Sequence, residues 1–219
     1  MNMLTINDLF DLNHTIAGAY LAQFTYPWEA LAGIKDFILS VGPTLEEYEE
    51  VSPQVWVHKT AAVAPTAYQG APCIIGPETE VRHCAFIRGS ALVGAGCVVG
   101  NSVELKNVIL FDGVQTPHYN YVGDSILGYK SHMGAGSITS NVKSDKLPVV
   151  IRYGEERVDT GRKKVGAMLG DLVEVGCNSV LNPGTVIGRS SIVYPTSCVR
   201  GVLPERSIHK NDGSVIHRN

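Results

Sequence analysis

The amino-acid sequence predicts an all-β fold, a parallel β-helix in which short strands wind into stacked triangular coils. The first observation that predicts it is a six-residue repeat of large apolar side chains. The repeat includes every sixth residue from Val57 to Phe111, then Leu127 and Met133, and then every sixth residue from Leu169 to Val199. Seventeen of these eighteen positions are apolar, and only Gln69 is polar. A period of six fits neither the 3.6-residue repeat of a helix nor the two-residue repeat of an ordinary strand.

The neighbouring positions supply two further observations. Glycine directly follows nine of the eighteen positions, and a small residue usually lies four positions after each of them. The small residues are Ala61, Ala67, Cys73, Thr79, Ala85, Ala91, Cys97, Ser131, Ser137, Ser179 and Thr185. A large inward residue, a glycine near a sharp corner and a small inward residue describe one side of a narrow prism. Three such sides make one coil, and coils stack about 4.8 Å apart.

The N-terminal segment, residues 1–50, is expected to be helical. A helix that begins at Pro27 and ends before Gly42 would place five apolar side chains on one face. These side chains are Trp28, Leu31, Ile34, Ile38 and Val41. An earlier short helix is expected between Ile6 and Phe24. We expect the whole segment to cover the open first coil, because an exposed strand edge invites aggregation.

The β-helix is expected to span residues 51–204, with two loops. The hexad changes phase between Phe111 and Leu127, which predicts an irregular loop at residues 112–126. A polar and basic stretch predicts a second loop at residues 139–164, after which the hexad returns in phase. Loops that leave a rigid scaffold commonly carry binding and catalytic residues. Residues 205–219 are expected to form a C-terminal tail.

Composition excludes several classes of function. The formal net charge is only −3, so a general electrostatic affinity for nucleic acid or for anionic membranes is not expected. No apolar run reaches the length of about 18 residues that a membrane-spanning helix needs. The start of the chain lacks a secretory signal pattern, so we expect a cytoplasmic protein. The five cysteines form no Cys-x-x-Cys pair, and we interpret them as small apolar residues in a reducing compartment, with no metal site.

Two of the cations at corner positions where glycine is common are separated by one coil. Arg88 and Lys106 are 18 residues apart, which is one full coil, so they should lie at the same corner on adjacent rungs. Two like charges about 5 Å apart repel each other unless an anion lies between them, so the pair suits a phosphate. His118 lies in the first predicted loop and could act as a general base, because the reference pKa of histidine is close to physiological pH. The alternative is that all three are ordinary solvated side chains.

Two stretches of the chain resemble a known family. The segment VELKNVIL and the later TPHYNYVGDSILGYKSHMGAGSITSN resemble the acetyltransferase half of the bacterial bifunctional enzyme that makes UDP-N-acetylglucosamine. DTGRKKVGAMLGDLVEVGCNSVLNPGTVIG resembles the C-terminal domains of archaeal and bacterial sugar-1-phosphate nucleotidylyltransferases. The resemblance covers most of residues 27–204 and implies a left-handed β-helix. Residues 1–50 hold no glycine-rich phosphate loop, so we expect a stand-alone domain without pyrophosphorylase activity.

The resemblance implies an N-acetyltransferase of nucleotide-sugar synthesis. Its co-substrates would be acetyl-coenzyme A and an amino-sugar 1-phosphate, such as glucosamine- or galactosamine-1-phosphate. His118 matches the catalytic base, and Asn141 matches an asparagine near the acetyl group. Arg88 and Lys106 match the cations that hold the sugar phosphate, and Tyr121 matches a tyrosine that binds the same sugar.

The resemblance also implies a homotrimer, with acetyl-coenzyme A bound along the coils between subunits. Cys177, Ser179 and Pro195 match positions along that groove. The chain departs from the family pattern at two substrate-binding positions. His132 stands where the family has an asparagine, and the family lysine falls on Leu147, with Lys146 adjacent as a substitute. These departures leave the identity of the amino sugar open.

Two other functional classes stay open. The first is a non-catalytic module that trimerises or regulates, because fold alone does not determine function. The second is a carbonic anhydrase of the β-helical class, whose zinc ion is held by three histidines. It is disfavoured because His83, His118 and His132 do not share a corner by hexad phase, whereas zinc ligands must converge to about 2.0–2.1 Å from the metal.

Overall fold

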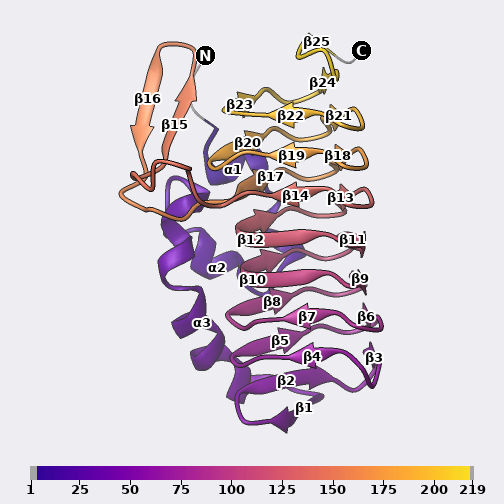
Figure 1. Cartoon of the computed structure of the whole chain (residues 1–219). Coiled ribbons are helices and arrows are strands. Elements are labelled where there is room, and N and C mark those ends of the chain that lie inside the picture. The colour runs from indigo at the N-terminus through magenta and orange to yellow at the C-terminus, as the bar shows by residue number, and fades with distance from the viewer. Residues whose placement is uncertain (1–3, 218–219) are drawn as a thin grey trace.

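The computed structural model describes residues 4–217, so the ends of the predicted N-terminal and C-terminal segments, residues 1–3 and 218–219, lie outside it. The chain winds into a left-handed parallel β-helix whose coils stack along one axis (Figure 1). The fold class predicted from the hexad is therefore confirmed. Among the helices in the described range, none is long and apolar enough to cross a membrane.

Each coil contributes one short strand to each of three faces. The first face contains β2 (Val55–His58), β5 (Cys73–Ile75), β8 (Ala91–Val93), the C-terminal halves of β10 (Glu104–Leu110) and β12 (Tyr121–Leu127), β17 (Ala167–Leu169), β20 (Thr185–Ile187) and β23 (Val202–Leu203). The second face contains β3 (Ala62–Val63), β6 (Glu80–Val81), β9 (Val98–Asn101), β11 (Gln115–His118), β13 (His132–Met133), β18 (Glu174–Val175), β21 (Ile192–Val193) and β24 (Ser207–His209). The third face contains β4 (Tyr68–Gln69), β7 (Phe86–Ile87), the N-terminal halves of β10 and β12, β14 (Ile138–Thr139), β19 (Val180–Leu181) and β22 (Cys198–Val199).

The interior of the prism contains the predicted inward side chains. Val81, Ile87 and Val99 are buried, as are their counterparts in later coils. Several of the small inward residues satisfy their own polar atoms, although the Ser131 hydroxyl has no hydrogen-bond partner among residues 4–217. For example, the Thr79 hydroxyl donates to the Gly94 carbonyl at 2.7 Å. Gln69, the one polar member of the series, lies on the first coil and is half-exposed, so the open end of the prism tolerates its amide.

The predicted loop at residues 112–126 is wrong, because this part of the chain continues the coils as β11 and β12. The phase change arises instead at two shortened corners inside β10 and β12. Leu105 pairs with Ile87, 18 residues earlier, whereas Leu110 pairs with Val93, 17 residues earlier. Leu127 likewise pairs with Leu110, again 17 residues earlier. Each of these two corners is one residue shorter than the others, and the two losses together account for the whole phase change. Each shortened corner turns at a residue with positive φ.

Those two corner residues are Asn107, with φ 54°, and Asp124, with φ 49°. Asparagine and aspartate adopt this left-handed conformation more readily than other non-glycine residues.

The second interruption lies between β14 and β17. Here the chain leaves the prism and forms an antiparallel hairpin of β15 (Val150–Tyr153) and β16 (Glu156–Asp159), which projects from the side of the solenoid (Figure 1). The chain rejoins the coils at Gly166, whose N–H donates to the Asp124 carbonyl at 2.8 Å.

The predicted tail from residue 205 is also corrected. The segment continues the solenoid as β24, and β25 (Val215–His217) folds back antiparallel on it. This hairpin covers the last coil. Backbone hydrogen bonds with β21 hold it there, because the last edge of a parallel sheet offers unpaired N–H and C=O groups.

The N-terminal segment lies along the first face, which corrects the expectation that it covers the first coil. Its elements are α1 (Ile6–Leu9), η1 (Leu12–His14), α2 (Gly18–Leu21), η2 (Pro27–Ala32), α3 (Ile34–Val41) and η3 (Gly42–Thr44), so the predicted longer helices are each divided. The first coil is flanked instead by β1 (Tyr48–Ser52), antiparallel to β2. The outward residues of the first face are apolar and buried, among them Ile74, Leu92 and Ile109. Strands buried on both sides favour such continuous apolar runs.

Candidate active site

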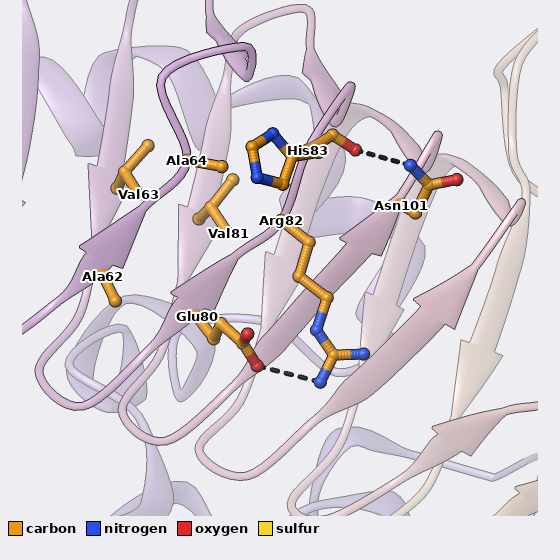
Figure 2. A pocket seen from close by; sticks show the side chains of 8 residues that line it. All are labelled: Ala62, Val63, Ala64, Glu80, Val81, Arg82, His83 and Asn101. Carbon is orange, nitrogen blue, oxygen red and sulfur yellow. Dashed lines mark hydrogen bonds and ion pairs between the residues drawn. The ribbon is translucent and has the colours of Figure 1, made fainter.

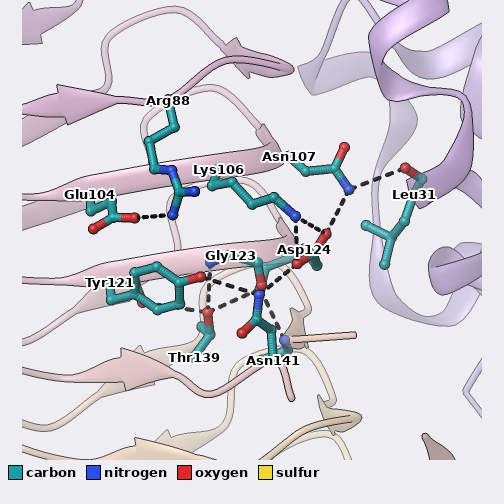
Figure 3. Close-up of polar contacts among 12 residues, drawn as sticks. Leu31, Arg88, Glu104, Lys106, Asn107, Tyr121, Gly123, Asp124, Thr139 and Asn141 are labelled. Atoms are coloured by element: carbon teal, nitrogen blue, oxygen red, sulfur yellow. Dashed lines mark hydrogen bonds and ion pairs between the residues drawn. The ribbon is translucent and has the colours of Figure 1, made fainter. Parts of the chain in front are cut away.

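A polar cluster occupies the corner at which the third face turns into the first, which we call the Lys106 corner. It comprises Arg88, Lys106, Asp124 and Asn141 with their direct partners (Figure 3). Arg88 and Lys106 lie on adjacent rungs here, since the Arg88 N–H donates to the Leu105 carbonyl at 2.8 Å. The stacking deduced from the 18-residue spacing therefore describes the backbone correctly.

Asp124 is the centre of this cluster. Its carboxylate accepts from Lys106 Nζ at 2.9 and 3.0 Å, from Asn107 Nδ2 at 2.9 Å and from Asn141 Nδ2 at 2.6 Å. The Asp124 side chain is only 3% exposed. A buried carboxylate is tolerated when donors satisfy its lone pairs, and here three side chains do so.

The Lys106 corner is attached to the N-terminal segment. Asn107 Nδ2 donates to the Leu31 carbonyl at 3.2 Å as well as to Asp124. η2, which carries Leu31, packs against β12. The helical segment over the first face therefore helps to fix Asn107 and, through it, the Asp124 carboxylate (Figure 3).

Each predicted phosphate-binding cation already has a carboxylate partner. Arg88 Nη1 donates to Glu104 Oε1 at 2.8 Å, and this hydrogen bond raises the pKa of the Arg88 guanidinium. Lys106 is paired with Asp124. The expected anion between Arg88 and Lys106 is therefore not needed, because two carboxylates already neutralise these cations. Arg88 is about half exposed, at 47%, so its ion pair is easily exchanged.

Tyr121 lies on the third face, and its side chain reaches the Lys106 corner. Its hydroxyl accepts from Asn141 Nδ2 at 3.2 Å. Burial raises the pKa of the Tyr121 hydroxyl, and the nearby Asp124 carboxylate raises it further. The hydroxyl therefore stays protonated at neutral pH and can donate to an acceptor on the surface of the third face.

His118 lies at the other edge of the third face, at the corner between the second and third faces, which we call the His118 corner. It ends strand β11 and pairs with Asn101 on the rung below, so its predicted position in a loop is wrong. Its side chain is exposed, and its backbone is held by the Asn120 side chain, which accepts the His118 N–H at 3.2 Å. The buried Asn120 amide in turn donates to the Gly134 carbonyl at 2.8 Å.

The His118 corner continues upward through a column of backbone hydrogen bonds. Gly136 N–H donates to the His118 carbonyl, Asn178 N–H to the Ala135 carbonyl and Thr196 N–H to the Cys177 carbonyl. Cys177 and Pro195 are exposed on this column. Ser179 is fully buried inside the prism and donates to the Tyr194 carbonyl at 3.0 Å. Its expected place along a cofactor groove is therefore wrong.

The same column continues downward to His83, whose carbonyl accepts from Asn101 Nδ2 at 2.9 Å. The expectation that His83 and His118 lie at different corners is therefore wrong, although they are two rungs apart and His132 lies on the second face. A hollow in the second face lies beside it, lined by residues that include Glu80, Arg82 and His83 (Figure 2). Figure 2 shows the Arg82 guanidinium turned to Glu80, and these two groups form an ion pair at 2.8 Å. None of the residues singled out as substrate-binding or catalytic lines this hollow.

Comparison with known proteins places the chain in a family. The model of the GMPPB C-terminal domain matches residues 71–216, which is more than half of the chain. The chain belongs to the GMPPB C-terminal domain family. This family assignment agrees with the resemblance to the C-terminal domains of sugar-1-phosphate nucleotidylyltransferases.

The chain is also similar to longer proteins. It is 34% identical over 94 residues to a bifunctional sugar-1-phosphate nucleotidylyltransferase/acetyltransferase of Sulfurisphaera tokodaii, covering 43% of this chain and 23% of that protein. It is 35% identical over 112 residues to the bifunctional protein GlmU of Methanococcus maripaludis, covering 51% of this chain and 27% of that protein. The chain thus spans about a quarter of the length of the curated relatives that it matches.

Solved structures of low sequence identity are similar as well. The acetyltransferase domain of PglB from Neisseria gonorrhoeae, in complex with acetyl coenzyme A, is 13% identical, with a TM-score of 0.34 over 73% of this chain and 55% of that chain. A mutant of AntD, an N-acyltransferase from Bacillus cereus, in complex with dTDP and coenzyme A, is 15% identical, with a TM-score of 0.35 over 80% of this chain and 92% of that chain.

In this member of the GMPPB C-terminal domain family, two predicted substrate-binding residues lie away from the Lys106 corner. His132 lies on the second face, where its Nδ1 is 2.9 Å from Glu174 Oε2. Lys146 lies in the segment between β14 and β15, and its side chain is exposed. Within residues 4–217, no group of three His, Cys, Asp or Glu side chains is placed to hold a metal ion.

The sequence reasoning missed the two carboxylates, Glu104 and Asp124. Asp124 was visible as the last residue of the motif His118-x-x-Tyr121-x-Gly-Asp124, but it carried no assigned role. A signal for both was available, because each lies 16 to 18 residues from the cation that it pairs with and therefore about one coil away.

Proposed function

We propose that this chain transfers acetyl from acetyl-coenzyme A to the amine of an amino-sugar 1-phosphate. The observation that carries the proposal is the Lys106 corner, where one buried carboxylate orients Lys106 and Asn141, with Tyr121 beside them. His118 lies at the other edge of the same face. A solenoid needs none of these side chains for its core, which is built from the inward aliphatic residues.

The third face lies between the His118 corner and the Lys106 corner and offers a surface for a sugar phosphate. Tyr121 lies between the two edges. We propose that Arg88 exchanges Glu104 for the phosphate and acts with Lys106, because a guanidinium binds phosphate oxygens in a bidentate manner.

The proposed reaction assigns the proton to His118. The sugar amine attacks the thioester carbonyl carbon, and the imidazole takes the proton that the nitrogen loses. The C–S bond then breaks, and the coenzyme A sulfur leaves with a proton from the imidazolium. Asn141 lies at the Lys106 corner beside Tyr121, so it would contact the sugar rather than the acetyl group. Acetyl-coenzyme A would lie along the His118 corner, beside Cys177 and Pro195.

The relatives support the same type of reaction. One matched protein carries the name sugar-1-phosphate nucleotidylyltransferase/acetyltransferase. The solenoid described here belongs to the GMPPB C-terminal domain family, and part of it matches that protein. We infer that the acetyltransferase activity resides in this part of the chain.

The experiment that tests this proposal is thiol release from acetyl-coenzyme A with a panel of amino-sugar phosphates. His118→Ala should lower turnover at least 100-fold, since general base catalysis contributes about 10²–10⁴-fold. His83→Ala is the matched control, because His83 is also exposed and lies on the same corner column. Equal turnover of wild type and His118→Ala would refute the assignment of the base.

One observation favours a second function, a non-catalytic assembly module. Both proposed phosphate-binding cations are paired with carboxylates, which a structural ion-pair ladder would also require. Calorimetric titration with glucosamine-1-phosphate separates the two functions. Binding that weakens at least tenfold in Arg88→Ala supports the enzyme, whereas absence of both binding and turnover supports the module.

We also propose that the chain assembles as a homotrimer through its solenoid faces. Tyr68 and Phe86 leave an aromatic pair exposed on the third face, with ring centroids 5.5 Å apart. Exposed apolar patches of this kind mark interaction surfaces. Sedimentation equilibrium should give three times the chain mass of 23.6 kDa, and a mass of one chain would exclude the trimer.

A further inference from the structure

A basic cavity adjoins the Lys106 corner on the side that faces the N-terminal segment. It lies between Leu31 and Ala32 of η2, the corner residues Lys106, Asn107 and Asp124, and the turn at residues 161–164. This turn, Gly-Arg-Lys-Lys, is the last part of the excursion that carries the β15–β16 hairpin. None of its residues has a role in the proposed acetyl transfer.

The cavity holds an excess of positive charge. Lys106, Arg162, Lys163 and Lys164 line it, and Asp124 is its one carboxylate. The Asp124 carboxylate is already occupied by three donors. Within residues 4–217, no ion pair includes Arg162, Lys163 or Lys164. In addition, Arg162 Nε is enclosed and has no hydrogen-bond partner in that range.

The backbone of the basic turn is anchored to the solenoid. Val165 N–H donates to the Asn141 carbonyl at 3.1 Å, and Val142 and Lys164 form an antiparallel bridge. The Thr160 hydroxyl donates to the Val149 carbonyl at 2.7 Å and accepts the Arg162 N–H at 3.2 Å. Three adjacent cations are therefore held together beside Lys106 by main-chain contacts, although like charges repel. An anion in the cavity would relieve that repulsion.

We propose that this cavity is a second anion subsite that binds a diphosphate, with one phosphoryl group on Lys106 and the other on the turn residues Arg162, Lys163 and Lys164. A single phosphate on Lys106 and Arg88 would leave the turn without a counter-charge. A diphosphate spans both groups of cations, because its two phosphorus centres are joined through one oxygen. Arginine and lysine are the side chains that bind phosphoryl oxygens.

The inference extends the proposed function, and its second part rests on that function. If the sugar lies on the third face with its first phosphoryl group at Lys106, the second phosphoryl group enters the basic cavity. The substrate class would then include amino sugars linked to a nucleoside diphosphate, with the nucleoside beyond the turn. Binding of a free diphosphate, by contrast, depends on the cavity alone.

The test is isothermal titration of the whole chain with inorganic pyrophosphate, and with inorganic phosphate at matched ionic strength as comparator. Pyrophosphate should bind with one site per chain and at least tenfold more tightly than phosphate. Lys163→Gln/Lys164→Gln should weaken pyrophosphate binding at least tenfold. Lys35→Gln/Lys59→Gln is the matched control, because it removes the same charge from exposed positions outside the cavity and should change binding less than twofold.

Three results would overturn the proposal. These are pyrophosphate affinity no greater than that of phosphate, an equal loss in both double variants, or unchanged affinity in Lys163→Gln/Lys164→Gln. A measurement on the wild-type chain guards against misfolded variants. Saturating pyrophosphate should protect Lys163 and Lys164 from acetylation by an amine-reactive ester, read by mass spectrometry, while Lys35 stays reactive. Lack of protection would contradict the subsite.

The two proposals can fail separately. His118→Ala should bind pyrophosphate as the wild type does, since His118 lies at the other corner and outside the cavity. If acetyl transfer is absent but pyrophosphate binding persists, only the proposed function fails. If both hold, Lys163→Gln/Lys164→Gln should raise KM for a nucleoside-diphosphate amino sugar at least tenfold, with little change in kcat or in KM for the 1-phosphate.

Discussion

At the scale of single residues, Asp124 determines the geometry of the candidate site. It turns the shortened corner with a positive φ, and its buried carboxylate gathers Lys106, Asn107 and Asn141. A short polar side chain serves both purposes, because aspartate tolerates the left-handed conformation and can accept several hydrogen bonds. One residue therefore links the fold of the corner to the position of the polar groups.

We predict that Asp124→Asn lowers the free energy of unfolding by about 2–3 kcal/mol. Breaking a buried ion pair typically costs about 3–5 kcal/mol, and Lys106, which is 28% exposed, recovers part of this from water. The amide NH2 group of the new asparagine would also face the donor groups of Lys106, Asn107 and Asn141. Glu104→Gln is the matched control at an exposed pair, and urea unfolding should show no measurable change there. Equal losses in both variants would contradict the special position of Asp124.

At the scale of elements, the N-terminal segment turns the first face into an interior layer. Strands of this face are buried on both sides, so Ile74, Leu92 and Ile109 point outward from the prism and yet are shielded from water. Phe10 also packs against Phe111, with ring centroids 5.0 Å apart. The helices thus stabilise the middle coils, and through Leu31 they reach the Lys106 corner.

Substitutions on two faces should therefore differ in cost. Ile109→Ala should lower the free energy of unfolding by about 3 kcal/mol, because it leaves a cavity under the helices. Ile138→Ala on the third face should cost less than about 1.5 kcal/mol, because Ile138 is partly exposed and water can fill the space. Chemical denaturation measures both. Similar costs would show that the N-terminal segment does not pack on the first face in solution.

The attachment of the N-terminal segment should depend on pH. Asp171 accepts the N–H groups of Asp11 at 2.7 Å and Tyr129 at 2.8 Å, and burial raises the pKa of its carboxyl above the ordinary value of 3.8. The folded protein then binds a proton more tightly than the unfolded chain does. The contribution of Asp171 to stability is therefore fully present below pH 3.8 and is lost as the pH rises through the folded pKa.

We predict that the stability of the wild type relative to Asp171→Asn is greater at pH 4 than at pH 7. The variant lacks the titrating carboxyl, so the difference between the two unfolding midpoints isolates its contribution. Thermal unfolding monitored by circular dichroism at both pH values measures this difference. If the difference between the two midpoints is the same at both pH values, or favours the wild type more at pH 7, the pKa of Asp171 is not raised.

At the scale of the whole molecule, stability is distributed along the solenoid. Each coil packs on its two neighbours, and the antiparallel strands β1 and β25 flank the first and last coils. Such arrays derive their stability from interfaces between adjacent repeats, so the middle coils are the most protected. The cysteines sample both environments, because Cys73 and Cys97 lie inside the prism, whereas Cys84, Cys177 and Cys198 are exposed.

We predict that three thiols react quickly with Ellman's reagent and two react only when the solenoid opens. Burial raises the pKa of the Cys73 and Cys97 thiols to about 12, so these two have almost no thiolate in the folded state. Stopped-flow absorbance should show a fast phase of three thiols and a slow phase that accelerates with urea. More than three fast thiols would show that the coils open more readily than this packing allows.

The sequence by itself determined the class of fold and the stacking of one corner. Aliphatic residues at every sixth position can be buried together only if the chain turns three times per coil. An 18-residue coil then places Arg88 beside Lys106 without further information. The apolar triplets at residues 55–57, 73–75 and 91–93 lack the outward polar residue of a solvated strand. They are a signal for a covered first face that our expectation of a covered first coil did not use.

Only the tertiary structure decided the charges and the loops. Glu104 and Asp124 neutralise the two cations from neighbouring rungs, and which partner each cation chooses depends on side-chain reach rather than on period. The phase change predicts a loop wrongly, because the loss of a residue at a corner and the insertion of a loop both shift the six-residue repeat. Backbone pairing distinguishes them, since hydrogen bonds between rungs continue through β10 and β12.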